Sequence, residues 1–276
     1  MSRTVYETHT MEDPRLPIIF HTDTVINTPD RISNWHENIE ILCFISGKGR
    51  IRIDSEWKPV GAGDIAVINP EMLHAVTSDE RIIYHCLIVD NGFCTDNGID
   101  VSKNEFCDII TDGKLYSLLC SLAEKLGALR EGTADQYAIP EARHGVLGVL
   151  IELCRRYVKR ELQGDHASQS PAMQTVRNII TYLREQSGAV SLDHIAEHVG
   201  MSKYHMSREF KRITGTTIFE YLNISRCKKA RKMLYAGAKV SEAAIASGFD
   251  NLSYFSRTFK RYMGLLPSEC ISHTDS

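Results

Sequence analysis

A nine-residue pattern that occurs twice near the end of the chain constrains its fold more than any other feature. The stretch SREFKRITG at residues 207–215 returns 49 residues later as SRTFKRYMG at residues 256–264. Ahead of each copy lies an apolar, alanine-containing stretch that ends in glycine, at residues 192–200 and 240–248. Glycine commonly ends a helix, so the duplication predicts two similar units that each begin with a helix.

A short turn with a helix-capping residue follows each glycine. Ser202 can cap the next helix in the first unit, and Asp250 or Asn251 can do so in the second. A helix, a turn of a few residues containing glycine, and a second helix form the helix-turn-helix pattern. The sequence therefore predicts an all-α C-terminal domain with two helix-turn-helix units.

The second helix of each unit carries the candidate DNA contacts. Phe210 and Phe259 are expected to face the core, which leaves the opposite face for DNA. Arginine can bond guanine or phosphate, lysine suits phosphate, and an aromatic ring can contact a thymine methyl group. The alternative, a solvated basic face, leaves the duplication unexplained. The expected DNA-binding residues are Tyr204, His205, Ser207, Arg208, Lys211, Arg212, Ser253, Tyr254, Ser256, Arg257, Lys260 and Arg261.

A helix predicted over residues 218–234 connects the two units. If their second helices enter successive major grooves on one side of the duplex, this helix must hold them about 34 Å apart. Its apolar face is expected to hold Ile218, Tyr221, Leu222 and Leu234, and its outward face Arg226, Lys228, Lys229, Arg231 and Lys232.

The net charge of the whole chain is misleading. A formal charge of −3 over 276 residues argues against a nucleic-acid-binding protein. Residues 1–171, however, hold 17 Lys and Arg against 26 Asp and Glu, whereas residues 172–276 hold 15 against 9. We therefore expect an effector-sensing and dimerisation domain at 1–163, a polar linker at 164–171, and a basic DNA-binding domain at 172–276.

The acidic half contains short β-rich runs at residues 39–45, 50–54, 64–68 and 81–89. Gly and Pro between them, at residues 46–49, 61–63 and 69–70, supply turn geometry. Short strands at nearly regular spacing are typical of an antiparallel sandwich or small barrel. The predicted fold class is α+β with two domains, an N-terminal antiparallel barrel with a helical appendage and the helical DNA-binding domain.

Parts of this half resemble the cupin family, whose His and Glu residues hold a metal inside a barrel. The resemblance rests on WHENIE at 35–40, Gly47, the pair at 63–64, and PEMLH at 70–74. Asn38 replaces the second histidine and Glu40 follows too closely, so only His36 and His74 stand where ligands are expected. A catalytic metal needs about three protein ligands, so no metal or other cofactor is expected. A metal-dependent cupin enzyme with a DNA-binding tail is the alternative.

An eight-stranded barrel can hold one small ligand, so polar residues of this half are candidates for effector binding. They are Trp35, His36, Glu40, His74 and His85. Trp35 suits a sugar, because an aromatic face binds the apolar side of a pyranose. The alternative is that His36, Glu40 and His74 are polar residues hydrogen-bonded at the barrel rim.

Two apolar stripes between the barrel and the linker have helical spacing. They either pack against the barrel or form a homodimer face, and both contacts are possible together. The stripes are Leu115, Leu118, Leu119, Leu122, Leu126 and Leu129, and Val146, Val149, Leu150, Leu153 and Tyr157.

The C-terminal motifs resemble the AraC/XylS family of bacterial transcription regulators over about 100 residues, from Thr175 to Glu269. The match is carried by AAIASGFDNLSYFSRTFK at 243–260, Gly264 and PSE at 267–269, although Cys270 and Ile271 stand where the family has an aromatic residue and Arg. Many members carry a cupin-like sensor ahead of this tail. The resemblance implies a non-enzymatic, effector-controlled regulator that binds double-stranded DNA, with activation of sugar-utilisation genes as the specific expectation. A ligand-independent architectural DNA binder is a further alternative.

Two expectations concern the environment of the protein. The first residues lack the apolar stretch of a signal peptide, and no segment approaches 18 uncharged apolar residues, which predicts a cytoplasmic protein without membrane contact. Eight cysteines without a C-x-x-C pair are expected to be reduced and mostly buried.

Overall fold

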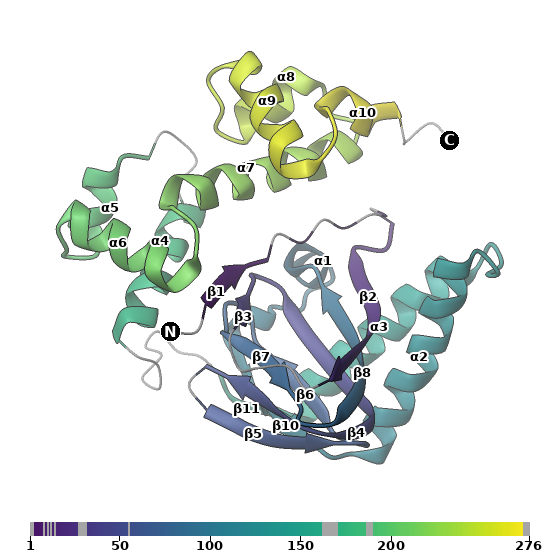
Figure 1. Cartoon of the computed structure of the whole chain (residues 1–276). Coiled ribbons are helices and arrows are strands. Elements are labelled where there is room, and N and C mark those ends of the chain that lie inside the picture. Colours follow the sequence, from purple (N-terminus) through teal and green to yellow (C-terminus); the bar gives the residue numbers. More distant parts are fainter. Residues whose placement is uncertain are drawn as a thin grey trace. The chain divides into compact units, whose positions relative to one another are not determined.

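The computed structural model describes residues 3–7, 9, 11, 13, 15–26, 32–54, 56–161, 171–185 and 190–272. The chain divides into two compact units, residues 1–3 with 11–167 and residues 4–10 with 168–276. The first unit is rich in strands, and the second consists of helices from residue 171 onward (Figure 1). The predicted linker at 164–171 lies outside the described residues except for Pro171, where a helix begins.

Antiparallel strands form the framework of the first unit. Strand β4 pairs with β5, β6, β7 and β8, while β2 pairs with β8, β3 with β7, and β10 with β6. The short strands β9 and β11 form a separate antiparallel pair. The strands of this unit are β2 (Ile18–Ile26), β3 (Ile32–Trp35), β4 (Ile39–Ile53), β5 (Glu56–Gly61), β6 (Ile65–Ile68), β7 (His74–Thr77), β8 (Arg81–Val89), β9 (Asn104–Phe106), β10 (Ile109–Ile110) and β11 (Val158–Glu161). Most of β1 (Arg3–Tyr6) is assigned to the second unit.

Strand β4 organises the sheet because its two halves have different neighbours. Residues 39–47 pair with β6 and β8, and residues 48–53 pair with β5 and β7. Gly47 lies between the halves with φ of +85°, and a Cβ there would stand 1.9 Å from the carbonyl oxygen of Arg81. Only glycine fits this position. The turn expected at residues 46–49 is therefore wrong, because the glycine bends a continuous strand.

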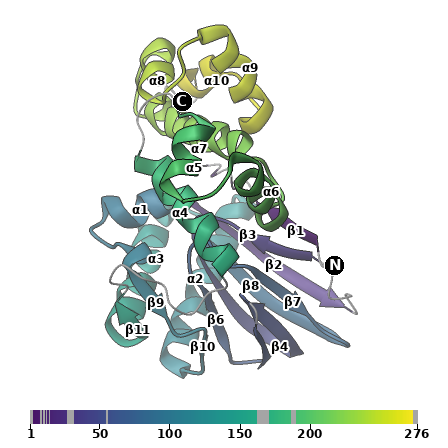
Figure 2. The same ribbon diagram turned by 90° about the vertical axis from the view of Figure 1, so that its left-hand side faces the viewer.

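Successive residues of β4 and β8 face two different apolar cores. Ile41 and Leu87 belong to a core shared with helices α2 (Gly113–Glu131) and α3 (Ala138–Arg156), which lie along one face of the sheet (Figures 1 and 2). Leu42 and Cys86 belong to the core on the other face. This alternation follows from the period of two in a β-strand.

The apolar stripes of α2 and α3 pack against the sheet and against each other. Helix α2 is capped at both ends: the carboxylate of Asp112 accepts a bond of 2.8 Å from the amide of Leu115, and Gly132 ends the helix in the left-handed conformation. The predicted packing on the β-rich domain is confirmed by the buried residues Leu115, Leu119, Leu122 and Leu126 in α2, and Val146, Val149, Leu150 and Leu153 in α3.

The predicted β-rich domain with helices is thus present. Among the described residues, however, the strand pairings do not show the sheet closing into a barrel. Helix α1 (Asn91–Asp96) and a short 3-10 helix (Val101–Lys103) connect β8 to β9. Within the described ranges, no helix has the length and apolar character needed to cross a membrane.

The second unit contains the two predicted helix-turn-helix units. Helices α5 and α6 form the first, α8 and α9 form the second, and α7 connects them. Phe210 and Phe259 are fully buried, as expected. The helices are α4 (Pro171–Glu185), α5 (Leu192–His198), α6 (Lys203–Thr214), α7 (Ile218–Tyr235), α8 (Val240–Ala246), α9 (Leu252–Met263) and α10 (Pro267–Ser272).

Equivalent caps explain why the repeated pattern forms equivalent helices. Ser202 begins α6 by accepting a bond of 3.3 Å from the amide of His205, and Asn251 begins α9 by accepting one of 2.8 Å from the amide of Tyr254. Each helix has 12 residues and ends at a left-handed glycine, Gly215 or Gly264 in the repeated pattern.

Candidate DNA interface and effector site

Helix α6 presents its predicted DNA contacts on one open face. Tyr204 is 76% exposed, and Ser207 is half-buried beside the core residue Met206. A small half-buried residue allows a helix to approach DNA closely. The other exposed members of this face are His205, Arg208, Lys211 and Arg212.

Helix α9 repeats this arrangement at the equivalent positions. Ser256 is half-buried like Ser207, and Arg257 is exposed like Arg208. The Arg257 side chain bends back so that Nε donates a bond of 3.3 Å to the carbonyl oxygen of Ser253. Ser253, Tyr254, Lys260 and Arg261 are also exposed.

The final arginines of the two faces have different partners. Arg212 donates to both carboxylate oxygens of Glu209, which lowers the pKa of that carboxyl group. Arg261 instead lies 5.3 Å from the ring centre of Tyr262. A phosphate must therefore compete with Glu209 for Arg212, whereas the Arg261 guanidinium makes a cation–π contact instead.

Helix α7 supports α9 through two contacts that the sequence did not predict. Asn223 donates a bond of 3.0 Å from Nδ2 to the hydroxyl oxygen of Tyr254. The Arg226 guanidinium lies against Gly248 in the turn before α9, at 3.0 to 3.2 Å from the position of a Cβ atom there. These contacts hold the start of α9 against α7.

The predicted outward basic face of α7 is partly wrong. Arg231 is buried at 7% exposure, and Arg226 is half-buried, with a pKa that burial lowers. Helical spacing alone groups Arg226 and Arg231 with the exposed Lys229 and Lys232, because it does not show which flank of α7 receives α8, α9 and α10.

Three of the predicted effector residues meet inside the first unit. Glu40 Oε2 lies 2.6 Å from His36 Nε2 and 3.2 Å from His74 Nε2. All three side chains are buried, and the two imidazole rings stand edge to face with centres 5.0 Å apart. Glu40, which Sequence analysis leaves out of the cupin ligand positions, thus contacts both histidines.

The charge on Glu40 depends on these two rings. Burial alone would raise the pKa of a carboxyl group, but His74 and His36 hold the pKa of Glu40 well below its usual range. The second oxygen, Oε1, accepts a weak bond of 3.4 Å from the thiol of Cys86 in β8. We refer to His36, Glu40 and His74 as the His-Glu-His cluster.

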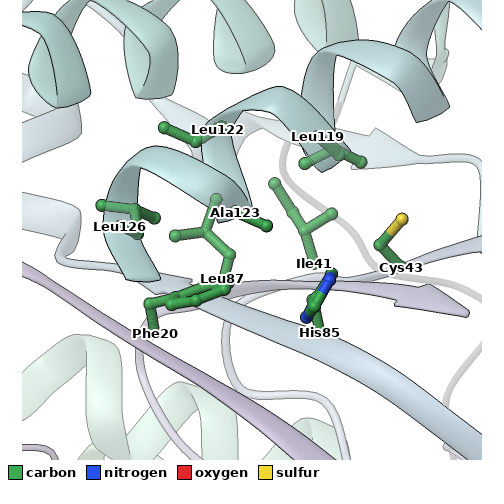
Figure 3. A pocket seen from close by; sticks show the side chains of 9 residues that line it. All are labelled: Phe20, Ile41, Cys43, His85, Leu87, Leu119, Leu122, Ala123 and Leu126. Carbon is green, nitrogen blue, oxygen red and sulfur yellow. The ribbon is translucent and has the colours of Figure 1, made fainter. Parts of the chain in front are cut away.

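Trp35 and His85 are the other two predicted effector residues. Trp35 is 2% exposed, so its indole is packed within the protein. His85 lies on the face of β8 that is turned toward α2, where Thr22 Oγ1 is 2.9 Å from Nδ1 and burial lowers its pKa. There it lines a small pocket with apolar side chains of β2, β4, β8 and α2 (Figure 3).

Comparison with known families decides what kind of protein this geometry belongs to. The AraC-like ligand binding domain matches residues 26–175, which is more than half of the chain, and a helix-turn-helix domain matches residues 195–272. The chain belongs to the AraC family of transcription regulators. AraC-family proteins are DNA-binding regulators and not enzymes. This confirms the prediction of a DNA-binding regulator and the prediction of a non-enzymatic protein.

Several curated proteins are similar to this AraC-family regulator. It is 23% identical to the Msm operon regulatory protein of Streptococcus mutans over 84% of both chains. It is 26% identical to the MmsAB operon regulatory protein of Pseudomonas aeruginosa, over 86% of this chain and 76% of that one. The transcriptional activator AarP of Providencia stuartii is 36% identical over 80 residues, which are 29% of this chain and 59% of AarP.

A solved structure is also similar to this AraC-family regulator. It is ToxT of Vibrio cholerae with a bound unsaturated fatty acid, at 16% identity and a TM-score of 0.42, covering 92% of this chain and 94% of ToxT.

Proposed function

We propose that this regulator binds a specific promoter sequence by placing α6 and α9 in successive major grooves, where Arg208 and Arg257 contact bases. The observation that supports this most is the equivalence of the two helices, each with a polar N-cap, a half-buried serine and an exposed arginine next to it. Lys211 and Lys260 then contact phosphates, which fix the register of the protein on DNA.

Selection of DNA from a random library by the full chain tests this proposal. The expected consensus has two short elements with centres about 10 base pairs apart, one for each recognition helix. Absence of any enriched sequence would contradict specific binding. A single enriched element would contradict the participation of both helices.

We also propose how the rest of the chain serves this function. Residues 1–163 sense a small effector and form a homodimer, 164–171 link the domains, and 172–276 bind DNA. AarP is named as an activator, and we extend that role to this chain. An effector must bind two states of the regulator with different affinity, so its addition should change DNA affinity or promoter activity.

The sugar prediction depends on an accessible aromatic face or a polar pocket. Trp35 is buried, so the structure adds no support for a pyranose stacked on it. A thermal-shift screen of mono- and oligosaccharides tests the prediction, because a ligand at 100 times its Kd stabilises a protein by about 2.7 kcal/mol. No shift with any sugar would exclude this class, and DNA affinity that no metabolite changes would favour a ligand-independent binder.

A further inference from the structure

Two free cysteines of the first unit, Cys43 in β4 and Cys120 in α2, lie next to each other. Cys43 belongs to the core that β4 shares with α2 and α3, and Cys120 packs against the same core. A hydrogen bond joins the two thiols. The pair faces the helices, on the side of β4 opposite to the His-Glu-His cluster.

Tyr116 fixes this part of α2 on the strand. Its hydroxyl group donates a bond of 3.3 Å to the carbonyl oxygen of Phe44, the residue after Cys43. Residues three and four positions apart share one face of a helix, so Leu119 and Cys120 lie on the side of α2 that Tyr116 turns toward β4. Leu119 and Cys43 accordingly line the same small pocket (Figure 3). The position of Cys120 beside Cys43 therefore follows from the packing of α2 on β4.

The two thiols differ in their access to solvent. Cys120 is half-buried, whereas Cys43 is 2% exposed, and burial together with the neighbouring Cys120 raises the pKa of the Cys43 thiol. A thiolate, and not a thiol, attacks an oxidant, so Cys43 is protected from reagents in solution. An oxidant therefore meets Cys120 first, and the Cys43 sulfur is already in place beside it.

We propose that Cys43 and Cys120 form a reversible disulfide bond when the protein meets a peroxide, and that this bond regulates the protein. Cys120 is the residue that the peroxide oxidises, and Cys43 is the residue that resolves the product into a disulfide. The regulatory part rests on the proposed function, whereas the disulfide itself does not.

The reaction balances with hydrogen peroxide as the oxidant. The Cys120 sulfur attacks one peroxide oxygen and the O–O bond breaks, which leaves a sulfenic acid at Cys120 and one water molecule. The Cys43 sulfur then attacks the Cys120 sulfur, and the Cys43 proton leaves with the hydroxide of the sulfenic acid as a second water molecule. The two thiols lose two electrons, and the peroxide gains them. A dithiol reductant reverses the disulfide by exchange.

The new bond would draw α2 toward β4. A disulfide bond is about 2.0 Å long, which is shorter than a hydrogen bond between two sulfur atoms. Its formation therefore moves α2 toward the sheet and changes the pocket that Cys43 and Leu119 line. Helix α2 also packs on α3, so the movement reaches the whole helical layer of the effector domain.

Mapping of disulfides in the full chain tests the site. The reduced protein is treated with a few equivalents of hydrogen peroxide, remaining thiols are blocked with N-ethylmaleimide, and the digest is analysed by mass spectrometry without reduction. We expect a linked peptide containing Cys43 and Cys120, which dithiothreitol removes. Unlinked and fully blocked cysteines, or a Cys120 oxidised only to sulfinic or sulfonic acid, would overturn the site.

A second pair of neighbouring thiols provides an internal comparison. Cys94 and Cys154 interact electrostatically, but the Cys154 sulfur accepts a bond of 4.0 Å from the side-chain amide of Asn104. We therefore expect the link between Cys43 and Cys120 to form at lower peroxide concentration. Linkage of Cys94 to Cys154 in preference to it would overturn the assignment.

Variants then separate the two roles. Cys120→Ser should abolish the linked peptide, and Cys43→Ser should leave a sulfenic acid at Cys120 that dimedone traps. Cys107→Ser is the matched control, because Cys107 is a half-buried cysteine of the same unit. Circular dichroism checks that each variant is folded. Equal loss of the linked peptide in Cys107→Ser and Cys120→Ser would overturn the assignment.

DNA binding by the reduced and the oxidised protein separates this inference from the proposed function. A several-fold change in affinity that disappears in Cys120→Ser supports regulation by the disulfide. A complete disulfide with unchanged DNA affinity and promoter activity would overturn the regulatory part and keep the site. No specific DNA binding in either state would refute the proposed function, while the peptide map alone would still decide the site.

Discussion

The side-chain amide of Asn223 in α7 donates a hydrogen bond of 3.0 Å to the hydroxyl oxygen of Tyr254 in α9. Tyr254 is a predicted DNA contact near the N-terminus of its helix, and its backbone amide also bonds the N-cap Asn251. Asn223 therefore connects α7, which joins the two helix-turn-helix units, to the second helix of the second unit.

Removal of this bond should loosen the start of α9. Asn223→Ala and Tyr254→Phe are each expected to lower the free energy of unfolding by about 0.5 to 1.5 kcal/mol, because a hydrogen bond contributes about that much net. Urea unfolding of the two single variants and of the double variant measures the coupling energy between Asn223 and Tyr254. Strictly additive losses would show that the two side chains do not act together.

Gly248 should tolerate alanine less well than Gly200, its equivalent in the first unit. Both have positive φ, at +87° and +67°, and a side chain there costs about 1 to 2 kcal/mol. A Cβ at Gly248 would also lie 3.0 Å from Arg226 Nε, whereas nothing lies within 4 Å of one at Gly200. Gly248→Ala should therefore lower Tm more than Gly200→Ala, and Arg226→Ala should reduce the difference. Equal losses would contradict the contact.

Lys211 should contribute affinity without base preference. Lys211→Ala is expected to weaken binding equally on all sequences and to lower the salt slope of log Kobs by about 1, as loss of one phosphate contact does. The matched control is Lys125→Ala, an exposed lysine of the β-rich unit paired with Glu141. Fluorescence anisotropy over a range of salt concentrations measures both. An unchanged slope for Lys211→Ala would remove it from the interface.

The capping box at the start of α7 should make the stability of the second unit depend on pH. Glu220 accepts a bond of 2.9 Å from the amide of Thr217, which lowers its pKa, and Thr217 Oγ1 accepts one of 3.2 Å from the amide of Glu220. Thr217→Ala should cost about 1 kcal/mol of unfolding free energy at pH 7.

A lowered carboxyl pKa fixes the sign of the pH dependence. The stability from ionised Glu220 is complete above the ordinary Glu value of about 4.3 and is lost as pH falls through the lower folded-state pKa. The advantage of the wild-type protein over Glu220→Gln should therefore shrink from pH 7 to pH 3 in urea unfolding. A constant difference across this range would contradict the role of the charge.

The helical half could be predicted well because its signals are local. The repeat, the capping residues and the glycines lie within a few residues of the turns that they form, and the structure places Asn251 at the N-cap where two candidates had been open. The burial of Arg231 could not be predicted in this way, because it depends on how the later helices pack on α7.

The β-rich half depends on pairings between distant residues. His74 approaches His36 and Glu40 because β7 pairs with both β3 and β4. The cupin resemblance places His36 and His74 in one site, but local spacing alone does not predict the strand pairing that joins them. His85 was grouped with these residues by type, yet the alternation along β8 turns it to the other face of the sheet. The turn predicted at Gly47 is wrong for a similar reason. The carbonyl oxygen that makes only glycine fit there belongs to Arg81, which is 34 positions away in the sequence.

The base preference of the two equivalent arginines is the most direct test of the central claim. Affinities of the wild-type chain and of the Arg208→Ala, Arg257→Ala and double variants would be measured on the selected DNA and on a scrambled duplex. The account predicts wild-type preference of about 1000-fold or more, a loss of about 1 to 3 kcal/mol in each single variant on selected DNA only, and little preference in the double variant. A double variant that keeps the wild-type preference, or that loses affinity equally on both duplexes, would contradict it.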